Sequence, residues 1–504
     1  MARVIDITTP LDKDVLLFHK MRATEEMGRL FEYELDLLSS QGDLDLDEVL
    51  GKSMTITLER ADQGVRHFSG LCSRIAQGGM EGRYYVYHAT LRPWLWFLTR
   101  TKNYRIFQEK NVPDILKEIF SQHAAIADVQ DELTESYGPW TYCVQYNESD
   151  FAFVSRLMEH EGIYYYFKHS EGKHTLVLAD SYSAHTSAYD DEIPFIPPEE
   201  RIRPEREHVS AWSITRELQP GKYALAAYDF EKPSVDLQVR SNIKRSHVLS
   251  EYEIFEYHWD YIDRNDGETY ARTRIEEEQA KYERTRGATN ARGMAPGYLF
   301  NLGSHPRSDQ NAEYVVVSAA YQMQAGQYEG RDTAAAEYSC KFTALSTQQP
   351  FRAERITPKP IVHGPQTALV VGPAGEDIHT DKFGRIKVHF YWDRYGKRDD
   401  TSSCWIRVSQ NWGGKGWGGM FIPHVGQEVI VQFEGGDPDL PLVTGRVYNA
   451  ENMPPAELPA GKTQSVIRDH GANQIIMEGE AGKQRISMYS PTGETSFSIG
   501  AAKS

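Results

Sequence analysis

The sequence has few cysteines, no long hydrophobic run and no dense block of positive charge. Its four cysteines, Cys72, Cys143, Cys340 and Cys404, lie far apart among 504 residues, with no Cys-x-x-Cys pair and no cluster of cysteine and histidine. A disulfide framework or a zinc site is therefore not expected, and scattered thiols are typical of a reducing compartment. We predict no metal and no cofactor.

Two further absences concern membranes and nucleic acids. No stretch of about 18 apolar residues occurs, and residues 1–14 lack a charged segment followed by an apolar run. We therefore expect no transmembrane helix and no signal peptide, and a protein that folds in the cytoplasm. The net charge of −17 comes from 55 basic and 72 acidic residues, without a run of five Lys or Arg. Binding to nucleic acid or anionic lipid needs such basic patches, so neither partner is expected.

The composition is typical of a large, mainly β protein with some α. Hydrophobic residues make up 40% and aromatic residues 12% of the chain, with 39 Gly and 24 Pro as turn formers. At roughly 100–200 residues per domain, this length indicates about three to five domains. Alternating apolar residues predict strands at 54–58, 84–88, 175–179 and 314–318.

Three helices are expected between these strands. Residues 111–122 place apolar side chains on one face, which predicts an amphipathic helix. Ser149 caps a second helix, which ends at Gly162. A third, highly charged helix is expected from Asp266 to about Arg286, either on the surface or beside a partner.

Proline-rich segments divide the chain into predicted domains. Five prolines between residues 350 and 373 mark one boundary, and the segment 453–459 contains three more. Between them, about five short alternating strands predict a small barrel of the oligonucleotide/oligosaccharide-binding (OB) type. The predicted domains are residues 1–365, 366–452, a linker over 453–470, and residues 471–504.

The last predicted domain contains an 11-residue repeat. Gly471, Gly482 and Gly493 mark its turns, and an apolar-x-apolar strand follows each. One interpretation is a β-meander packed on the preceding barrel. However, three short strands with one apolar stripe cannot bury that stripe alone. We therefore favour three chains that wrap their stripes into a triangular prism, which also hides the strand edges. The predicted core residues of this trimeric needle are Ile475, Met477, Ile486, Met488, Phe497 and Ile499.

Enzymatic motifs are incomplete. The segment 51–53 reads Gly-Lys-Ser, but Leu46 stands where a phosphate-binding loop needs glycine. Residues 414–419 match the dinucleotide pattern GxGxxG, yet a further strand rather than a helix is expected after them, which favours a barrel loop. No catalytic residue is predicted, and we expect that the protein is not an enzyme.

Several long, ordered stretches resemble the VgrG spike proteins of type VI secretion systems. The resemblance begins near the N-terminus, at Leu16 and residues 28–33, and continues into the tail. It is carried by residues 145–167, 381–393, 403–412, 422–429 and 436–449.

The resemblance implies a fold and a set of partners. Residues 1–365 should form a hub like that of a contractile-phage baseplate, with two β-barrels per chain. Three chains then present six barrels to a hexameric Hcp tube. The tail should be a trimeric β-prism or β-helix needle, capped by a PAAR-repeat tip protein. A phage lysozyme domain has no counterpart between barrel and repeat, which argues against a cell-wall hydrolase in this chain.

The function implied is mechanical. A homotrimer would puncture the target envelope and deliver effectors, directly or through adaptor proteins, and would leave the cell without a signal peptide. Two alternatives stay open. Trp392, Trp405, Trp412 and Trp417 near the barrel could stack bases or sugars, although nearby acidic residues disfavour this. An enzyme in the N-terminal region would need a polar pocket that no residue spacing indicates.

Overall fold

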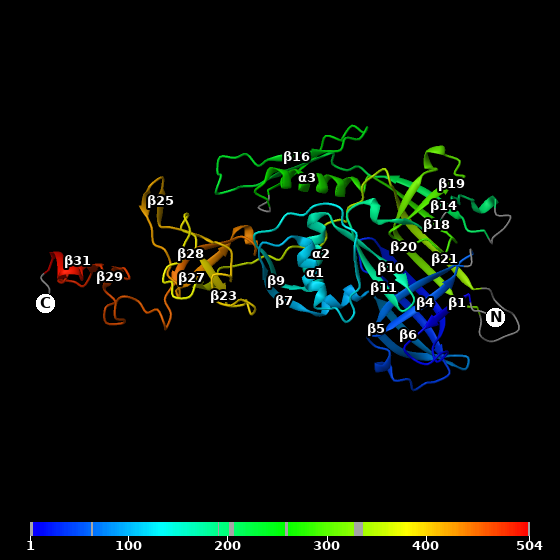
Figure 1. The fold of residues 1–504 in the computed structure, drawn as a ribbon, viewed down its shortest axis with the longest axis horizontal. Coiled ribbons are helices and arrows are strands. Elements are labelled where there is room, and N and C mark those ends of the chain that lie inside the picture. Colours follow the sequence, from blue (N-terminus) through cyan, green and yellow to red (C-terminus); the bar gives the residue numbers. More distant parts are fainter. Residues whose placement is uncertain are drawn as a thin grey trace. The chain divides into compact units, whose positions relative to one another are not determined.

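The chain divides into two compact units, Met1–Pro360 and Ile361–Ser504 (Figure 1). The computed structural model describes residues 4–61, 64–189, 191–200, 206–257, 261–326 and 336–501. Across these residues, no helix is both long and apolar enough to span a bilayer. The division falls in the proline-rich segment where the sequence indicates a boundary, and the finer domain limits stay predictions.

The first unit is built around one continuous 13-stranded sheet. Its main path runs in space through β1 (Ile5–Thr8), β4 (Ser53–Glu59), β5 (Val65–Glu81), β6 (Tyr84–Arg92), β3 (Glu32–Ser39), β2 (Leu17–Glu26), β20 (Glu313–Gln324), β21 (Glu337–Ser346), β18 (Glu283–Thr289) and β14 (Val209–Arg216). β19 (Tyr298–Gly303) branches from β20 and pairs in parallel with β12 (Thr186–Ser187) and β13 (Ile193–Pro194). The pairing of β2 with β20 joins the two halves, so that Lys20 lies opposite Gln324.

Three smaller sheets accompany the large one. They are formed by β7 (Lys102–Phe107) with β9 (Cys143–Ser149), by β8 (Val129–Asp131), β10 (Tyr164–Ser170) and β11 (Lys173–Ala179), and by β15 (Lys222–Ala226), β16 (Val239–Asn242) and β17 (Glu253–Tyr257). The four strands predicted in this unit are confirmed, because they lie within β4, β6, β11 and β20. The buried side chains of this unit form a core rich in aromatic rings, including Tyr33, Phe68 and Trp94.

The first two helices begin and end at the residues that the sequence indicates. α1 (Val112–Ser121) is capped by Asn111, whose side chain accepts a hydrogen bond from the Asp114 N–H at 2.8 Å. α2 (Asp150–Glu161) is capped by Ser149, which accepts from the Ala152 N–H at 3.1 Å. Gly162 ends α2 with φ of 76°, a left-handed conformation that favours glycine.

The third helix, α3 (Arg264–Gln279), is shorter than predicted and packs one face on the β15–β17 sheet. The partner that this charged helix needs is therefore the β15–β17 sheet of the same chain. The expected extension to Arg286 is wrong, because β18 begins at Glu283. There the backbone pairs with β14 and β21, and the buried Thr285 hydroxyl donates to the Ala344 carbonyl at 3.0 Å.

The second unit contains a five-stranded sheet that matches the predicted barrel strands. In spatial order these are β23 (Lys387–Phe390), β22 (Gln366–Val371), β27 (Glu428–Phe433), β28 (Pro441–Val447) and β24 (Arg407–Val408). Ile386, Val388 and Phe390 are all buried, as their alternation predicts. The GxGxxG segment lies in a hairpin of β25 (Trp412–Gly414) and β26 (Trp417–Gly419), with no helix after it. It is a barrel loop, as expected.

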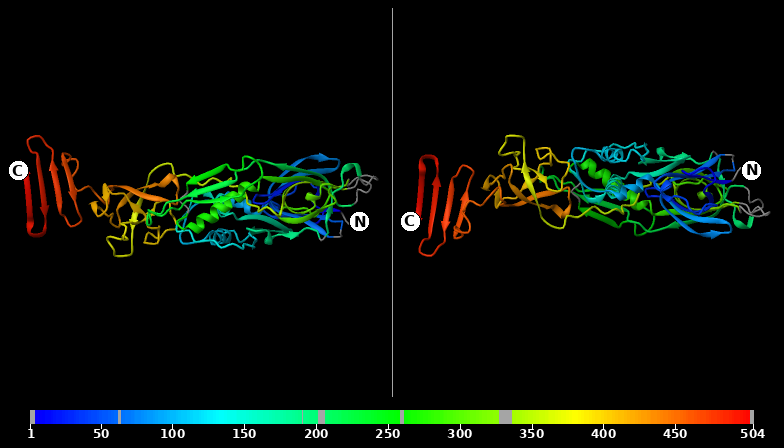
Figure 2. Two further views of the ribbon diagram at one scale, coloured as in Figure 1. Left: turned by 90° about the horizontal axis from the view of Figure 1, so that it is seen from above. Right: turned by 90° about the horizontal axis from the view of Figure 1, so that it is seen from below.

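The rest of the second unit is a four-stranded antiparallel meander, in which neighbouring strands lie side by side (Figure 2). Its strands are β29 (Gln464–Arg468), β30 (Gln474–Glu478), β31 (Arg485–Ser490) and β32 (Thr495–Gly500). The 11-residue repeat therefore corresponds to three successive strands, β30 to β32, with glycine in or beside the turns between them. β29 lies inside the segment 453–470 that the sequence indicates as a linker.

Candidate functional site: an exposed apolar sheet face

The register of the meander brings all the predicted needle residues onto one face. In each pair of neighbouring strands, an apolar residue lies opposite another apolar residue. Residues that face each other across an antiparallel pair project from the same side of the sheet. The pairs are Ile475 with Met488, Met477 with Ile486, Ile486 with Ile499, and Met488 with Phe497.

This apolar face is accessible to solvent in the single chain. The exposed fractions are 43% for Met477, 49% for Ile486, 47% for Met488, and 59% for both Phe497 and Ile499, and Ile475 is half-buried. Scattered exposed apolar residues are ordinary, but a contiguous apolar patch marks an interaction surface. The strands do form a meander within the chain, yet most of their apolar stripe stays open. The prediction that these residues form the core of a trimer remains a prediction.

A seventh residue, Ile467 on β29, extends the same face. It lies directly opposite Ile475 and is 52% exposed. Sequence reasoning missed it because Ile467 precedes Ile475 by eight residues and so falls outside the 11-residue period. The segment 464–468 reads Gln-Ser-Val-Ile-Arg, which has no apolar–polar alternation, so the sequence offers no clear strand signal there. We call these seven side chains the apolar face.

The four tryptophans of the alternative binding hypothesis do not share one surface. Trp412 and Trp417 meet edge to face at 5.4 Å in the β25–β26 hairpin and are 64% and 58% exposed. Trp392 instead stacks on Phe390 at 4.9 Å, and its indole N–H donates to Gln366 at 2.8 Å. Trp405 packs against the His379 ring. The structure therefore brings only two of the four together.

The N-terminal unit contains a cavity of about 550 Å³, which Glu25, Arg29, Arg286 and Lys341 help to line. Glu25 is buried, and this burial raises the pKa of its carboxyl group. Its charge has partners: the Tyr33 hydroxyl donates to it at 2.5 Å, and the Arg66 guanidinium lies 3.5 Å away. Because these buried groups satisfy one another, they are suited to stabilising the sheet.

Two family models match the chain. Residues 24–327 match the phage tail baseplate hub (GPD), and residues 370–448 match the type VI secretion system/phage-baseplate injector OB domain. Most strands of the large sheet and of the five-stranded sheet fall within these ranges. β1, most of β2 and β21 lie outside the first range, and most of β22 lies before the second. The two models together define a phage-tail-like protein that combines a baseplate hub with an injector OB domain.

Relatives from Pseudomonas aeruginosa identify the family. The type VI secretion system spike protein VgrG1b of Pseudomonas aeruginosa is 48% identical over 498 residues, which cover 97% of this chain and 67% of the relative. VgrG1a of the same species is 47% identical over 500 residues, covering 97% of this chain and 77% of the relative. The chain belongs to the VgrG family of type VI secretion system spike proteins.

Solved structures share the fold. The E. coli c3393 protein, a component of the type VI secretion system with similarity to phage tail proteins, gives a TM-score of 0.63 at 19% identity, covering 88% of this chain and 99% of that one. A chain of the lidded Francisella PdpA-VgrG complex gives 0.64 at 10% identity, covering 98% and 78%. At these identities, the likeness concerns the fold.

One further relative carries the name of a toxin. The actin cross-linking toxin VgrG1 of Vibrio cholerae is 35% identical over 467 residues, which cover 91% of this chain but only 42% of the toxin. Most of that protein therefore lies outside the region that it shares with this chain.

Proposed function

We propose that three copies of this chain assemble through the apolar face into the needle of a type VI secretion spike. The observation that carries this proposal is the alignment of seven apolar side chains on one solvent-accessible face. Burying each side chain contributes roughly 1.5–3 kcal/mol. Three such faces around one axis would therefore contribute on the order of tens of kcal/mol before chain entropy is subtracted.

The remaining roles follow from the spike family. The hub-like residues 1–365 would dock on the hexameric Hcp tube, and a PAAR-repeat protein would cap the needle. The spike would assemble in the bacterial cytoplasm and be driven into a target cell with its effectors or adaptors. Its role would be mechanical, with any catalytic activity supplied by what it carries. The Vibrio cholerae toxin supports this division, because it shares this region and adds a larger part of its own.

The mass of the chain in solution tests the trimer. Light scattering after gel filtration at physiological salt should give a species near 3 × 57.5 = 172.5 kDa. A wild-type chain that stays monomeric would contradict the proposal.

The substitution Ile486→Asp tests the apolar face itself. It would bring three carboxylates to one point on the needle axis, where burying an unpaired charge is costly, so the trimer should dissociate. Ser498→Asp is the matched control, because Ser498 lies on the opposite face of β32 and is exposed. If Ile486→Asp keeps the trimer content of Ser498→Asp, the apolar face is not the trimer interface.

A further inference from the structure

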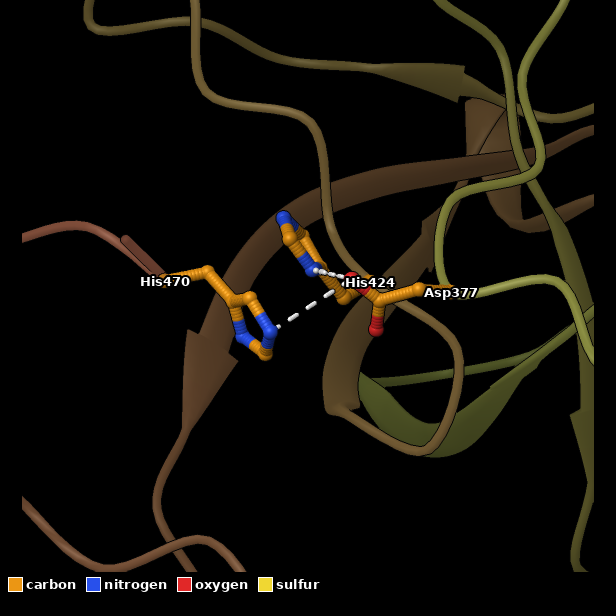
Figure 3. Close-up of side chains that lie close together, drawn as sticks. All are labelled: Asp377, His424 and His470. Carbon is orange, nitrogen blue, oxygen red and sulfur yellow. Dashed lines mark hydrogen bonds and ion pairs between the residues drawn. The ribbon is translucent and has the colours of Figure 1, made fainter. Parts of the chain in front are cut away.

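Three side chains from separate loops of the second unit converge in the structure (Figure 3). Asp377 lies between β22 and β23, His424 precedes β27, and His470 lies in the turn between β29 and β30. The His424 Nδ1 atom is 3.0 Å from the Asp377 Oδ2 atom, and the His470 Nε2 atom is 3.9 Å from the same oxygen. One potential ligand atom from each residue lies within 4.8 Å of the others.

The backbone around two of these side chains is fixed by hydrogen bonds. The Val425 N–H donates to the Asp377 carbonyl at 2.9 Å, which joins the two loops directly. The His424 N–H donates to the Gln427 side chain at 3.1 Å. Asp377 and His424 are therefore held close together by their own loops.

The turn that carries His470 is held separately. The Asp469 carboxylate accepts hydrogen bonds from both the backbone and the side-chain nitrogen of Asn473, each at 2.8 Å. These bonds fix the backbone on both sides of His470. The imidazole itself is 76% exposed and has room to turn.

We propose that Asp377, His424 and His470 bind a divalent transition-metal ion of the zinc type. Two imidazole nitrogens and one carboxylate oxygen suit zinc, whereas calcium and magnesium prefer oxygen ligands alone. With metal–ligand bonds of about 2.0–2.2 Å, tetrahedral ligands lie about 3.4 Å apart. The two imidazole nitrogens lie 3.0 and 3.9 Å from the Asp377 oxygen, which brackets that value, and they lie within 4.8 Å of each other. Side-chain rotations, above all of the exposed His470, would therefore complete the set. Three protein ligands leave one position for water or another ligand.

Such an ion would connect the barrel loops to the first turn of the meander. It would join His424 to His470 and so close a loop that contains the proline-rich segment 453–459. A metal ion that closes a long loop lowers the conformational entropy of the unfolded chain and thereby stabilises the fold. The sequence did not indicate this site, since its ligands come from three loops and share no motif spacing. The site does not depend on the trimer proposal, because all three ligands belong to one chain.

Calorimetric titration of Zn²⁺ into the metal-free full chain tests the site. One Zn²⁺ should bind per chain, whatever the oligomeric state. His470→Ala and Asp377→Asn should each weaken binding by at least 10–100-fold, since even residues that only support a metal ligand have effects of about that size. His363→Ala, which removes an exposed histidine of the same unit, should bind Zn²⁺ as the wild type does.

A spectroscopic measurement on the unsubstituted chain provides a second test. Co²⁺ in place of Zn²⁺ should give visible absorption typical of nitrogen and oxygen ligands in a low-coordinate site, and His424→Ala should abolish it. Absence of this absorption in the wild-type chain would overturn the proposal. So would equal Zn²⁺ affinity and stoichiometry in the ligand variants and in His363→Ala.

Discussion

His174 on β11 is a titratable side chain enclosed in the aromatic core of the first unit. Its Nε2 atom accepts a hydrogen bond from the Trp94 backbone N–H at 2.8 Å, so the ring is neutral. The Phe31 and Phe167 rings lie 5.4 and 5.9 Å from it. This burial, together with the neighbouring His169, lowers the pKa of His174 to about 3.

The lowered pKa makes the stability of this unit depend on pH. In the unfolded chain a histidine has a pKa of about 6.5. Below that pH, His174 is therefore protonated in the unfolded chain but stays neutral in the folded chain. The stability is therefore fully present above about pH 6.5 and is lost as the pH falls towards 3. Between pH 7 and pH 5, this single residue accounts for a loss of about 2 kcal/mol.

We predict that His174→Gln reduces this pH dependence. The glutamine amide oxygen can still accept from the Trp94 N–H but does not titrate. In urea unfolding of the first unit, the free energy should fall by about 2 kcal/mol less between pH 7 and pH 5 than in the wild type. A wild-type pH dependence in His174→Gln would show that His174 titrates normally.

At the scale of elements, Arg352 links the segment that follows β21 to three other parts of the first unit through hydrogen bonds and an ion pair. Its guanidinium donates to the carbonyl of Gly162 at the end of α2, at 3.0 Å, and to that of Asp180 after β11, at 2.9 Å. It also pairs with Glu276 of α3 at 2.9 Å. The Arg352 side chain is only 7% exposed, so each of these bonds is largely shielded from water.

We predict that Arg352→Ala destabilises the first unit by about 3–5 kcal/mol. The substitution leaves two carbonyls and the Glu276 carboxylate without this partner. Removing one member of a buried ion pair is strongly destabilising because the remaining charge stays buried without compensation. Urea unfolding gives the free energy, and limited proteolysis should cut the segment 350–357 faster. Arg307→Ala, which breaks a pair that is 60% and 55% exposed, should leave the stability nearly unchanged, because solvent screens such a pair. Equal effects of the two substitutions would contradict the anchoring role of Arg352.

The elements that could be predicted from the sequence are those fixed by neighbouring residues. Ser149 and Gly162 bound α2 through contacts within a few residues, and the alternation of Ile386, Val388 and Phe390 marks a buried strand face. The end of α3 could not be predicted in this way. Residues 283–289 become a strand because β14 and β21, distant in sequence, pair with them.

The candidate sites show the same limit. Six residues of the apolar face share the 11-residue period, so their common face follows from the sequence. Ile467 joins them only through the pairing of β29 with β30. The cluster of Asp377, His424 and His470 depends on how three loops fold together, which no local pattern records.

At the scale of the whole molecule, charge opposes the association that we propose for the apolar face. Each chain has a net charge of −17, so three copies carry 3 × −17 = −51. Repulsion between like charges extends over the Debye length, which is about 30 Å at 0.01 M salt and about 10 Å at 0.1 M. The free energy gained by burying apolar side chains is not electrostatic, so salt does not screen it.

We therefore predict that moderate salt strengthens the trimer. Raising NaCl from about 0.05 to about 0.3 M shortens the Debye length and weakens repulsion between the acidic chains, so the trimer should dissociate severalfold less. Sedimentation equilibrium at several protein concentrations measures this change. Ser498→Asp, which adds one negative charge per chain outside the apolar face, should make the salt effect steeper. If added salt instead dissociates the trimer, ion pairs between chains, rather than the apolar face, hold it together.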